Sequence, residues 1–165
     1  VAGSRGSVIP FFKSLSNKQN YFPITNVKMT RFWITLSQGV DFVLKSLERM
    51  KGGEIFIPVI PSFKIIDLAK AINPKLKIKV IGIRPGEKIN ELMCSSDESD
   101  QVIKFKDYYL ILNSIKNFAP TKNHYLKNDL NEKGTFVSKN FEYSSGKNKF
   151  FSISELKKRI NSIND

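Results

Sequence analysis

One segment, from Leu36 to Met50, constrains the fold of this chain more than any other. Apolar residues recur in it at helical spacing. They form one face: Val40, Val43, Leu44 and Leu47. Thr35 and Gln38 stand at capping-box spacing where the pattern begins, and Gly52-Gly53 follows it. The pattern therefore predicts an amphipathic helix of about four turns.

Strand and helix patterns alternate after this helix. A strand is predicted at Glu54–Ile57, a turn at Pro58–Pro61, a second helix capped by Ser62 that ends at Asn73-Pro74, and a second strand at Ile78–Ile83. This order indicates an α/β fold. The predicted strands are too few for an independent doubly wound domain.

The remaining segments carry weaker signals. We expect a helix at Ser7–Leu15 with Ser7 as N-cap, an extended piece at Phe22-Pro23-Ile24, a helical turn at Ile89–Met93, an exposed loop at 97–100, a strand at Tyr108–Leu112, loops and an extended tail over Ser114–Lys149, and a final helix opened by the capping box of Ser152 and Glu155. We accordingly divide the chain into a substrate-binding part, 1–113, and a C-terminal extension, 114–165.

Composition excludes several classes of protein. With 165 residues, 41% of them hydrophobic, the chain is long enough for one modest core. Charged residues interrupt every apolar stretch, so we expect no membrane span. Cys94 and His124 are single, which excludes a disulfide framework and a zinc site and fits a cytoplasmic setting. The start at Val1 lacks Met and a signal-peptide layout, so we do not expect it to be the natural N-terminus.

The charge favours anionic partners without choosing among them. Lys and Arg number 27 against 15 acidic residues, a formal charge of +12. Nucleotides, phosphates, nucleic acid and anionic lipid all fit. Aromatic residues among the lysines, such as Phe105, leave a nucleic-acid-binding module as an alternative. A compositional bias of the source genome toward Lys and Asn also fits, as in Lys147-Asn148-Lys149.

Two arginines stand out as candidate ligands of a diphosphate. Arg31 lies between apolar residues just before the main helix, and Arg84 opens a rigid turn after a predicted strand. Arginine offers a planar fork of donors that suits phosphate oxygens. Glu87 could accept hydrogen bonds from two ribose hydroxyls, although it could equally pair with Arg84 across the turn. Gly3–Ser7 resembles an anion-binding turn, but no catalytic motif accompanies it.

Taken in order, five stretches resemble one family. They are Gly3–Phe12 (GSRGSVIPFF), Phe22–Thr25 (FPIT), Met29–Ile34 (MTRFWI), Gly53–Pro58 (GEIFIP) and Ile81–Lys88 (IGIRPGEK), with further likeness at 131–134 and 141–145. The chain is similar throughout to the inverting UDP-N-acetylglucosamine 4,6-dehydratases, extended short-chain dehydrogenases/reductases of polysaccharide and flagellin-sugar biosynthesis. Asn90 and Cys94 depart from common residues of that family.

The resemblance implies a fold and a reaction. The fold would be the C-terminal part of an extended short-chain dehydrogenase/reductase, an incomplete NAD(P)-binding Rossmann fold plus a substrate-binding domain. In that family NADP oxidises the sugar at C4, water leaves from C6, and the hydride returns to C6 with C5 inverted. The catalytic and NADP-binding residues would precede Val1, so this chain alone would be inactive and would expose apolar surface where the missing half packs.

The resemblance also assigns binding residues and partners. Arg84 and Glu87 match positions that contact nucleotide phosphate and ribose, and Arg31 matches an arginine that contacts the diphosphate. Pro23 and Thr25 match the uridine pocket, while Ser7 and Val8 begin the helix beneath the sugar nucleotide. The implied partner is UDP-N-acetylglucosamine or a similar UDP-sugar, bound by a homo-oligomeric full-length protein, with no nucleic acid. A related epimerase or a retaining dehydratase stays an alternative.

Overall fold

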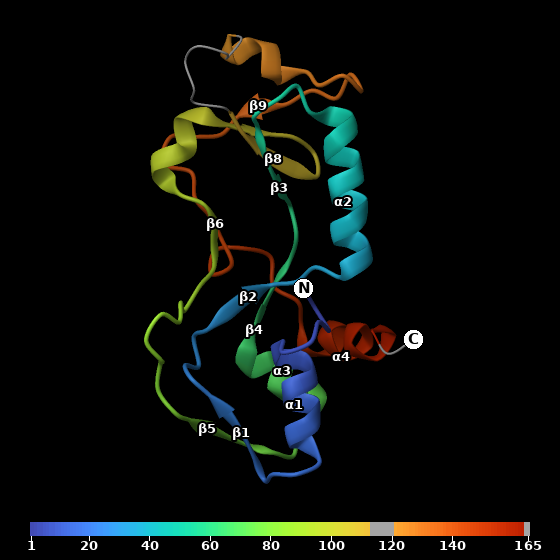
Figure 1. Ribbon diagram of the computed structural model, residues 1–165. Helices are drawn as coiled ribbons and strands as arrows, with labels where there is room; N and C mark the ends of the chain where they lie inside the picture. Colours follow the sequence, from blue (N-terminus) through green and yellow to red (C-terminus); the bar gives the residue numbers. More distant parts are fainter. Residues whose placement is uncertain (113–120, 164–165) are drawn as a thin grey trace. The chain divides into compact units, whose positions relative to one another are not determined.

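The computed structural model describes residues 1–112 and 121–163 (Figure 1). The chain has the α/β organisation that the sequence predicts, and it forms two compact units that are not consecutive in sequence. Unit 1 comprises 1–36, 60–91 and 144–165, and unit 2 comprises 37–59 and 92–143. The chain thus leaves unit 1 and returns to it twice. The predicted functional division at residue 113 is a different partition and stays a prediction.

Unit 1 combines helices with two small sheets. Its elements are α1 (Val8–Ser16), β1 (Tyr21–Ile24), β2 (Thr30–Phe32), β4 (Ser62–Lys64), α3 (Ile65–Ile72), β5 (Lys77–Val80) and α4 (Ile153–Ser162). Strands β1 and β5 pair in parallel, with Tyr21 opposite Lys77 and Ile24 opposite Val80. Strands β2 and β4 pair antiparallel, with Arg31 opposite Phe63. The predicted first and last helices and the extended piece at 22–24 are confirmed.

One hydrophobic core holds unit 1 together. Trp33 lies at its centre with its ring edge-on to Phe63 and Phe151, at centroid distances of 5.6 and 6.1 Å. Helix α4 packs against α3 and inserts the fully buried Leu156. The capping box predicted for α4 is present, since Glu155 N–H donates to Ser152 Oγ and Ser152 N–H donates to the Glu155 carboxylate. These contacts tie the end of the chain to its middle.

The segment before α4 is tied to β4. Ser62 N–H donates to the carbonyl of Lys149, and Phe151 N–H donates back to the carbonyl of Ser62. The Asn148 side-chain amide donates to the Ile60 carbonyl and to Ser62 Oγ. This explains why Ser62, predicted to cap a helix, instead begins a strand: its backbone and hydroxyl serve the returning chain, and α3 begins three residues later.

Unit 2 is a four-stranded antiparallel sheet with a long helix. The elements are α2 (Leu36–Arg49), β3 (Ile55–Pro58), β6 (Leu92–Cys94), the 3₁₀ helices η1 (Ser96–Gln101) and η2 (Lys122–Leu126), β7 (Val102–Lys104), β8 (Tyr108–Ile111), β9 (Thr135–Phe136) and β10 (Tyr143–Ser144), which crosses the unit boundary. The sheet order is β3-β8-β7-β9. The predictions of α2, β3 and β8 are confirmed.

A buried arginine joins α2 to the rest of unit 2. Arg49 is 6% exposed, donates from Nη2 to Glu132 at 2.8 Å and lies 3.3 Å from Asp107. Its guanidinium also stacks over Tyr108, 4.6 Å from the ring centre. The hydrogen bond from Arg49 is the main cause that lowers the pKa of Glu132. Burial raises the pKa of Tyr108 to about 12.

Several predictions for the second half of the chain are wrong. Residues 89–93, predicted as a helical turn, lead into the strand β6, and the expected loop at 97–100 is the helix η1 with its own capping box. The described residues of 114–149 are mainly turns and loops, as predicted, but they also include η2, β9 and β10, and Tyr125 enters the core of unit 2. Residues 113–120 lie outside the described part. Side-chain burial by distant strands, which local patterns do not report, decides these elements.

Two classes of feature are absent from the described residues. No helix there combines the length and apolar character needed to cross a membrane. No group of three or more His, Cys, Asp or Glu side chains in 1–112 and 121–163 is arranged to hold a metal ion. Cys94 is a free, buried thiol, and burial raises its pKa to about 11.

Candidate functional site

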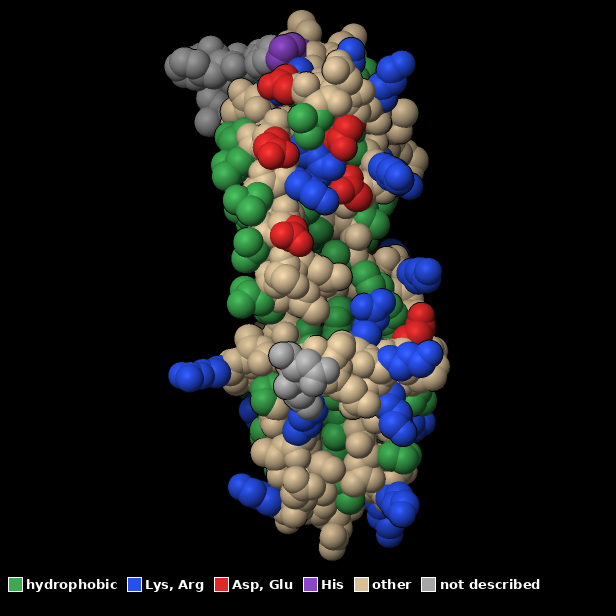
Figure 2. Space-filling model, turned by 90° about the vertical axis from the view of Figure 1, so that its right-hand side faces the viewer, with side chains coloured by type: hydrophobic (Ala, Val, Ile, Leu, Met, Phe, Trp, Pro, Cys, Tyr) green, Lys and Arg blue, Asp and Glu red, His purple; other side chains and the backbone are tan. Residues whose placement is uncertain are grey.

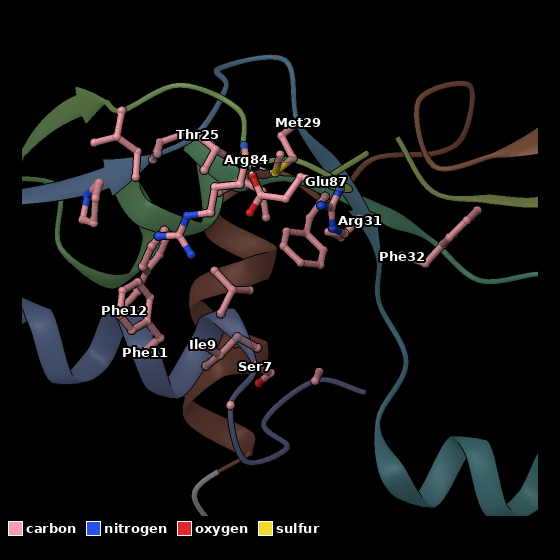
Figure 3. Close-up of a pocket in the computed structure, with 18 of the residues that line it drawn as sticks. Ser7, Ile9, Phe11, Phe12, Thr25, Met29, Arg31, Phe32, Arg84 and Glu87 are labelled. Atoms are coloured by element: carbon pink, nitrogen blue, oxygen red, sulfur yellow. Dashed lines mark hydrogen bonds between the residues drawn. The ribbon is translucent and has the colours of Figure 1, made fainter. Parts of the chain in front are cut away.

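A pocket of about 450 Å³ lies within unit 1 (Figure 3). Its walls come from the first turns of α1, the strands β1 and β2, and the segment that follows β5. All seven residues that the sequence assigned to substrate binding line it: Ser7, Val8, Pro23, Thr25, Arg31, Arg84 and Glu87. The fold therefore brings together residues up to 80 positions apart, while their role as ligand contacts stays a prediction.

The floor of the pocket is apolar. Ile9 and Phe12 on α1 are 3% and 2% exposed and belong to the core of unit 1. Phe63 of β4 and Ile65 of α3 also line the pocket and belong to the same core. An apolar base with a few polar groups at the rim is typical of small-molecule sites.

The first turn of α1 supplies donors to the rim. Ser7 is the N-cap, and its Oγ is buried without a hydrogen-bond partner. The first hydrogen bond of α1 runs from Phe11 N–H to the Ser7 carbonyl, and Pro10 has no N–H. The amides of Val8 and Ile9 therefore have no acceptor within the helix. Gly6 enters this turn at φ +76°, a left-handed conformation that favours glycine.

Arg84 and Glu87 lie on one exposed turn. Glu87 N–H donates to the Arg84 carbonyl at 3.1 Å, and Arg84 N–H donates to the Glu87 carboxylate at 3.1 Å. Gly86 adopts φ +81° within the turn. The two residues thus pair across the turn through their backbone amides, and among the described ion pairs there is none between their side chains. Figure 3 shows the Arg84 side chain extending over the pocket toward α1.

Arg31 contacts the chain that follows this turn. Its Nη1 donates to the carbonyls of Thr30, Lys88 and Ile89 at 2.7, 3.0 and 3.3 Å. Its Nε lies 3.2 Å from the carboxylate of Glu91. Arg31 therefore lines the pocket and at the same time fixes the backbone just beyond Arg84 and Glu87.

A buried hydroxyl pair, which the sequence reasoning missed, fixes the same backbone. Thr30 Oγ1 and Ser145 Oγ are 2.7 Å apart, and Ser145 is fully buried. Thr30 Oγ1 also donates to Asn90 Oδ1, while Glu91 N–H donates to Ser145 Oγ at 2.8 Å. Ser145 N–H donates to the Glu91 carbonyl at 2.8 Å. No local pattern could predict the pair, because 115 residues separate its members.

The uridine-pocket candidates lie on and after β1. Pro23 pairs in register with Lys79 of β5, and Thr25 follows the strand, where its Oγ1 lies 3.4 Å from Met29 Sδ. Ile81 N–H donates to the Ile24 carbonyl and extends the pairing one residue past β5. This bond anchors the other end of the segment that carries Arg84.

The net positive charge of the chain comes entirely from unit 1. The sequence of unit 1 holds 17 Lys and Arg against 5 Asp and Glu, a net +12, while unit 2 holds 10 of each. A compositional bias toward lysine would not by itself remove acidic residues from one unit. The unit with the pocket therefore has the field that attracts anions.

Comparison with known proteins places the chain in a family. The family model described as polysaccharide biosynthesis protein matches residues 1–113, more than half of the chain. This chain belongs to the polysaccharide biosynthesis protein family. The match covers the pocket-lining residues of unit 1 that precede position 91, and it confirms the resemblance inferred from the sequence motifs.

Three of the curated relatives of this chain have names of UDP-sugar enzymes. The chain is 54% identical over 163 residues to a UDP-N-acetylglucosamine 4,6-dehydratase (inverting) of Campylobacter jejuni serotype O:2, covering 98% of the chain and 48% of that protein. The counterpart from serotype O:23/36 is 53% identical over 149 residues, or 90% and 44% of the two chains. A UDP-glucose 4-epimerase of Rickettsia rickettsii is 41% identical over 115 residues, 67% of the chain and 34% of the enzyme.

A solved structure has the same fold as this family member. Pen from Bacillus thuringiensis superposes with a TM-score of 0.79 at 29% identity, over 99% of this chain and 48% of Pen. The chain thus spans about half the length of Pen and of the two dehydratases it matches. The α/β prediction is confirmed.

Proposed function

We propose that the pocket of unit 1 binds a UDP-sugar, with UDP-N-acetylglucosamine as the leading candidate. The observation that carries the proposal is the convergence of all seven predicted binding residues on one pocket in a chain 54% identical to an inverting UDP-N-acetylglucosamine 4,6-dehydratase. The +12 charge of the pocket-bearing unit further supports an anionic ligand.

Each part of such a ligand has a group of matching chemistry at the rim. The Arg84 guanidinium and the free amides of Val8 and Ile9 suit the diphosphate, because both are donors without a competing acceptor role. The Glu87 carboxylate suits the two ribose hydroxyls, since it only accepts. Pro23 and Thr25 would flank the uracil ring, and Ser7 Oγ is a buried hydroxyl still available to a sugar hydroxyl.

For the whole protein we propose a dehydratase that removes one water from the sugar, with NADP as cofactor. The glycines of the described chain do not fit NADP, because Gly3 and Gly6 do not have the spacing of the G-x-G-x-x-G motif that binds dinucleotides. This chain's own residues bind the substrate, orient it and exclude water from the apolar floor.

Calorimetric titration of the 165-residue chain with UDP and with UDP-N-acetylglucosamine tests the binding proposal. Arg84→Ala should weaken binding by roughly tenfold to a hundredfold, as expected for a lost charge-assisted hydrogen bond of about 1.5–3 kcal/mol. Lys158→Ala removes the same charge from an exposed position on α4 outside the pocket and is the matched control. Equal affinities of the two variants would contradict the proposal.

An epimerase is the second candidate, because the Rickettsia relative is 41% identical. Mass analysis of the product made by the full-length protein from UDP-N-acetylglucosamine and NADP separates the two reactions. A dehydratase lowers the product mass by one water, whereas an epimerase leaves it unchanged. None of the reported relatives supports the nucleic-acid alternative, which predicts salt-dependent binding to RNA or DNA.

We also propose a cytoplasmic setting and a homo-oligomeric full-length protein. The buried free thiol of Cys94 supports a reducing compartment. Native mass spectrometry of the full-length protein measures the oligomeric state directly.

A further inference from the structure

Three exposed lysines lie on and just before the strand β5. Lys77 and Lys79 belong to the strand, and Lys75 lies in the turn that leads into it. Lys79 Nζ lies 5.2 Å from the ring centre of Tyr21 on the paired strand β1, so these two side chains share one face of the sheet. Side chains alternate along a strand, which places Lys77 on the same face. The other face packs in the core of unit 1 through Phe22, Ile24 and Ile78.

The lysine-bearing face leads to the pocket of unit 1. Pro23, which lines the pocket, pairs in register with Lys79. Thr25 and Ile81, each two residues further along the chain, also line the pocket. The hydrogen bond from Ile81 N–H to the Ile24 carbonyl continues the pairing to this point. Side chains on one face of a strand recur every second residue, so Lys79 lies one step of about 7 Å from the pocket wall at Ile81.

The sequence around these lysines has no acidic residues that would cancel their charge. Residues 68–86 include five Lys or Arg and no Asp or Glu, and residues 1–36, which contain β1, have no acidic member. Among the ion pairs of the described residues, none involves Lys75, Lys77 or Lys79. In the lowest part of Figure 2, at the height of β1 and β5 in Figure 1, the visible charged side chains are Lys or Arg.

The three lysines act on an anion through their field and not through contacts in the pocket. None of them belongs to the described residues that line it. An exposed ammonium group on a flexible stem is a hydrated point charge. A row of such charges that ends at a pocket raises the local concentration of anions at its mouth and speeds their encounter with it. Charges that make no bond to the bound ligand affect its association more than its dissociation.

We propose that Lys75, Lys77 and Lys79 form an approach surface that steers the anionic ligand of unit 1 into its pocket. The partner that fits this surface is a nucleoside diphosphate or its sugar ester, because its phosphates are negatively charged at neutral pH. The inference rests on the proposed binding of a UDP-sugar and adds a path of entry to it. The ligand arrives along β5 and passes Lys79 before it reaches Arg84.

Stopped-flow mixing with UDP that carries a fluorophore on its terminal phosphate measures the association and dissociation rate constants separately. The β5 variant combines Lys75→Gln, Lys77→Gln and Lys79→Gln. At an ionic strength of about 0.1 M its association rate constant should be about threefold to tenfold below that of wild type, with the dissociation rate constant unchanged. At about 1 M salt the association rate constants should coincide, because screening over about 3 Å removes the field.

A matched variant separates a local effect from a change in net charge. Lys149→Gln, Lys157→Gln and Lys158→Gln together remove the same charge from exposed positions of unit 1 that do not line the pocket. This control should stay within about twofold of the wild-type association rate constant at about 0.1 M, where charges more than about 10 Å apart are largely screened. Lys79→Arg keeps the charge and should associate like wild type. Equal rates at high salt show that the pocket of the β5 variant is intact.

Three results would overturn the proposal. The β5 variant and the control could lower the association rate constant equally, so that only net charge matters. The β5 variant could instead raise the dissociation rate constant, which would make the lysines direct contacts. Its loss could also persist unchanged at high salt. Failure of the proposed function looks different, because the wild-type chain would then not bind the probe at either salt concentration, and steering would fall with it.

Discussion

The buried hydroxyl pair of Thr30 and Ser145 gives the sharpest prediction about how unit 1 holds its binding turn. In Ser145→Ala the Glu91 N–H loses its acceptor, and Thr30 Oγ1 loses one of its two partners. An unsatisfied buried donor costs about 1–3 kcal/mol, and a net hydrogen bond contributes about 1 kcal/mol. We therefore expect the free energy of unfolding to fall by about 2–3 kcal/mol.

The same substitution should also weaken the binding of the ligand. Residues 84–88 are exposed apart from the half-buried Glu87. They are anchored at one end by the Ile81–Ile24 hydrogen bond and at the other by the contacts of Thr30, Arg31 and Ser145. Loss of one anchor leaves Arg84 less ordered in the free protein. Ordering this side chain on binding then costs entropy and lowers the affinity. We expect about a threefold to tenfold rise in the Kd for UDP.

Urea unfolding monitored by the fluorescence of Trp33, combined with UDP calorimetry, measures both effects. Ser138→Ala, at an exposed position with no side-chain partner in the described structure, is the control and should change stability by under about 0.5 kcal/mol. Thr30→Val with Ser145→Ala should show coupling of at least about 0.5 kcal/mol. Additive effects, or a loss in Ser145→Ala no larger than in the control, would refute the reasoning.

Three further predictions concern the rest of the chain. Leu156→Ala should lower the free energy of unfolding by about 2–5 kcal/mol in urea, because it leaves a cavity where α4 meets α3; a loss below about 1 kcal/mol would contradict the packing. Cys94 should resist alkylation at pH 8 until the chain is unfolded, because a pKa of about 11 leaves roughly one thiolate in a thousand; rapid labelling of folded protein would show the thiol to be accessible. Glu132 has a lowered pKa in the folded state, so its contribution to stability is present above the unfolded pKa of about 4.3 and is lost as pH falls through the folded value. Urea midpoints of wild type should therefore drop at acidic pH, and Glu132→Gln should be less stable at pH 7 and lose less on acidification; parallel pH profiles would exclude this role.

Part of the fold follows from local chemistry and could be predicted. The capping box at Ser152 and Glu155 opens α4, and Gly52 at φ +122° follows the end of α2, as the sequence indicated. Ser62 shows where such reasoning fails. It has the chemistry of a helix cap, but its hydroxyl and backbone bond to residues 148–151 and make it a strand residue.

Some residues of the candidate site could likewise be predicted from the sequence, whereas others could not. Arg84 and Glu87 could be selected because their residue types and their turn are visible in a few consecutive letters, and motif likeness added Pro23 and Thr25. Ser145 could not be selected, because its importance lies in a 2.7 Å contact with Thr30, far away in sequence. The sequence could not show either that Arg31 donates hydrogen bonds to the backbone carbonyls of Lys88 and Ile89.

The sequence by itself determined the helices with strong periodicity, the binding residue types and the family likeness, since these depend on neighbours along the chain. Only the tertiary structure decided which face of α2 is buried. The apolar pattern alone would place Val43 and Leu47 inside, but the ion cluster of Arg49 and the packing of Phe42 hold the other face against the sheet. Burial is a property of the partner surface as well as of the helix, so the amphipathic pattern alone could not predict which face of α2 packs on the sheet.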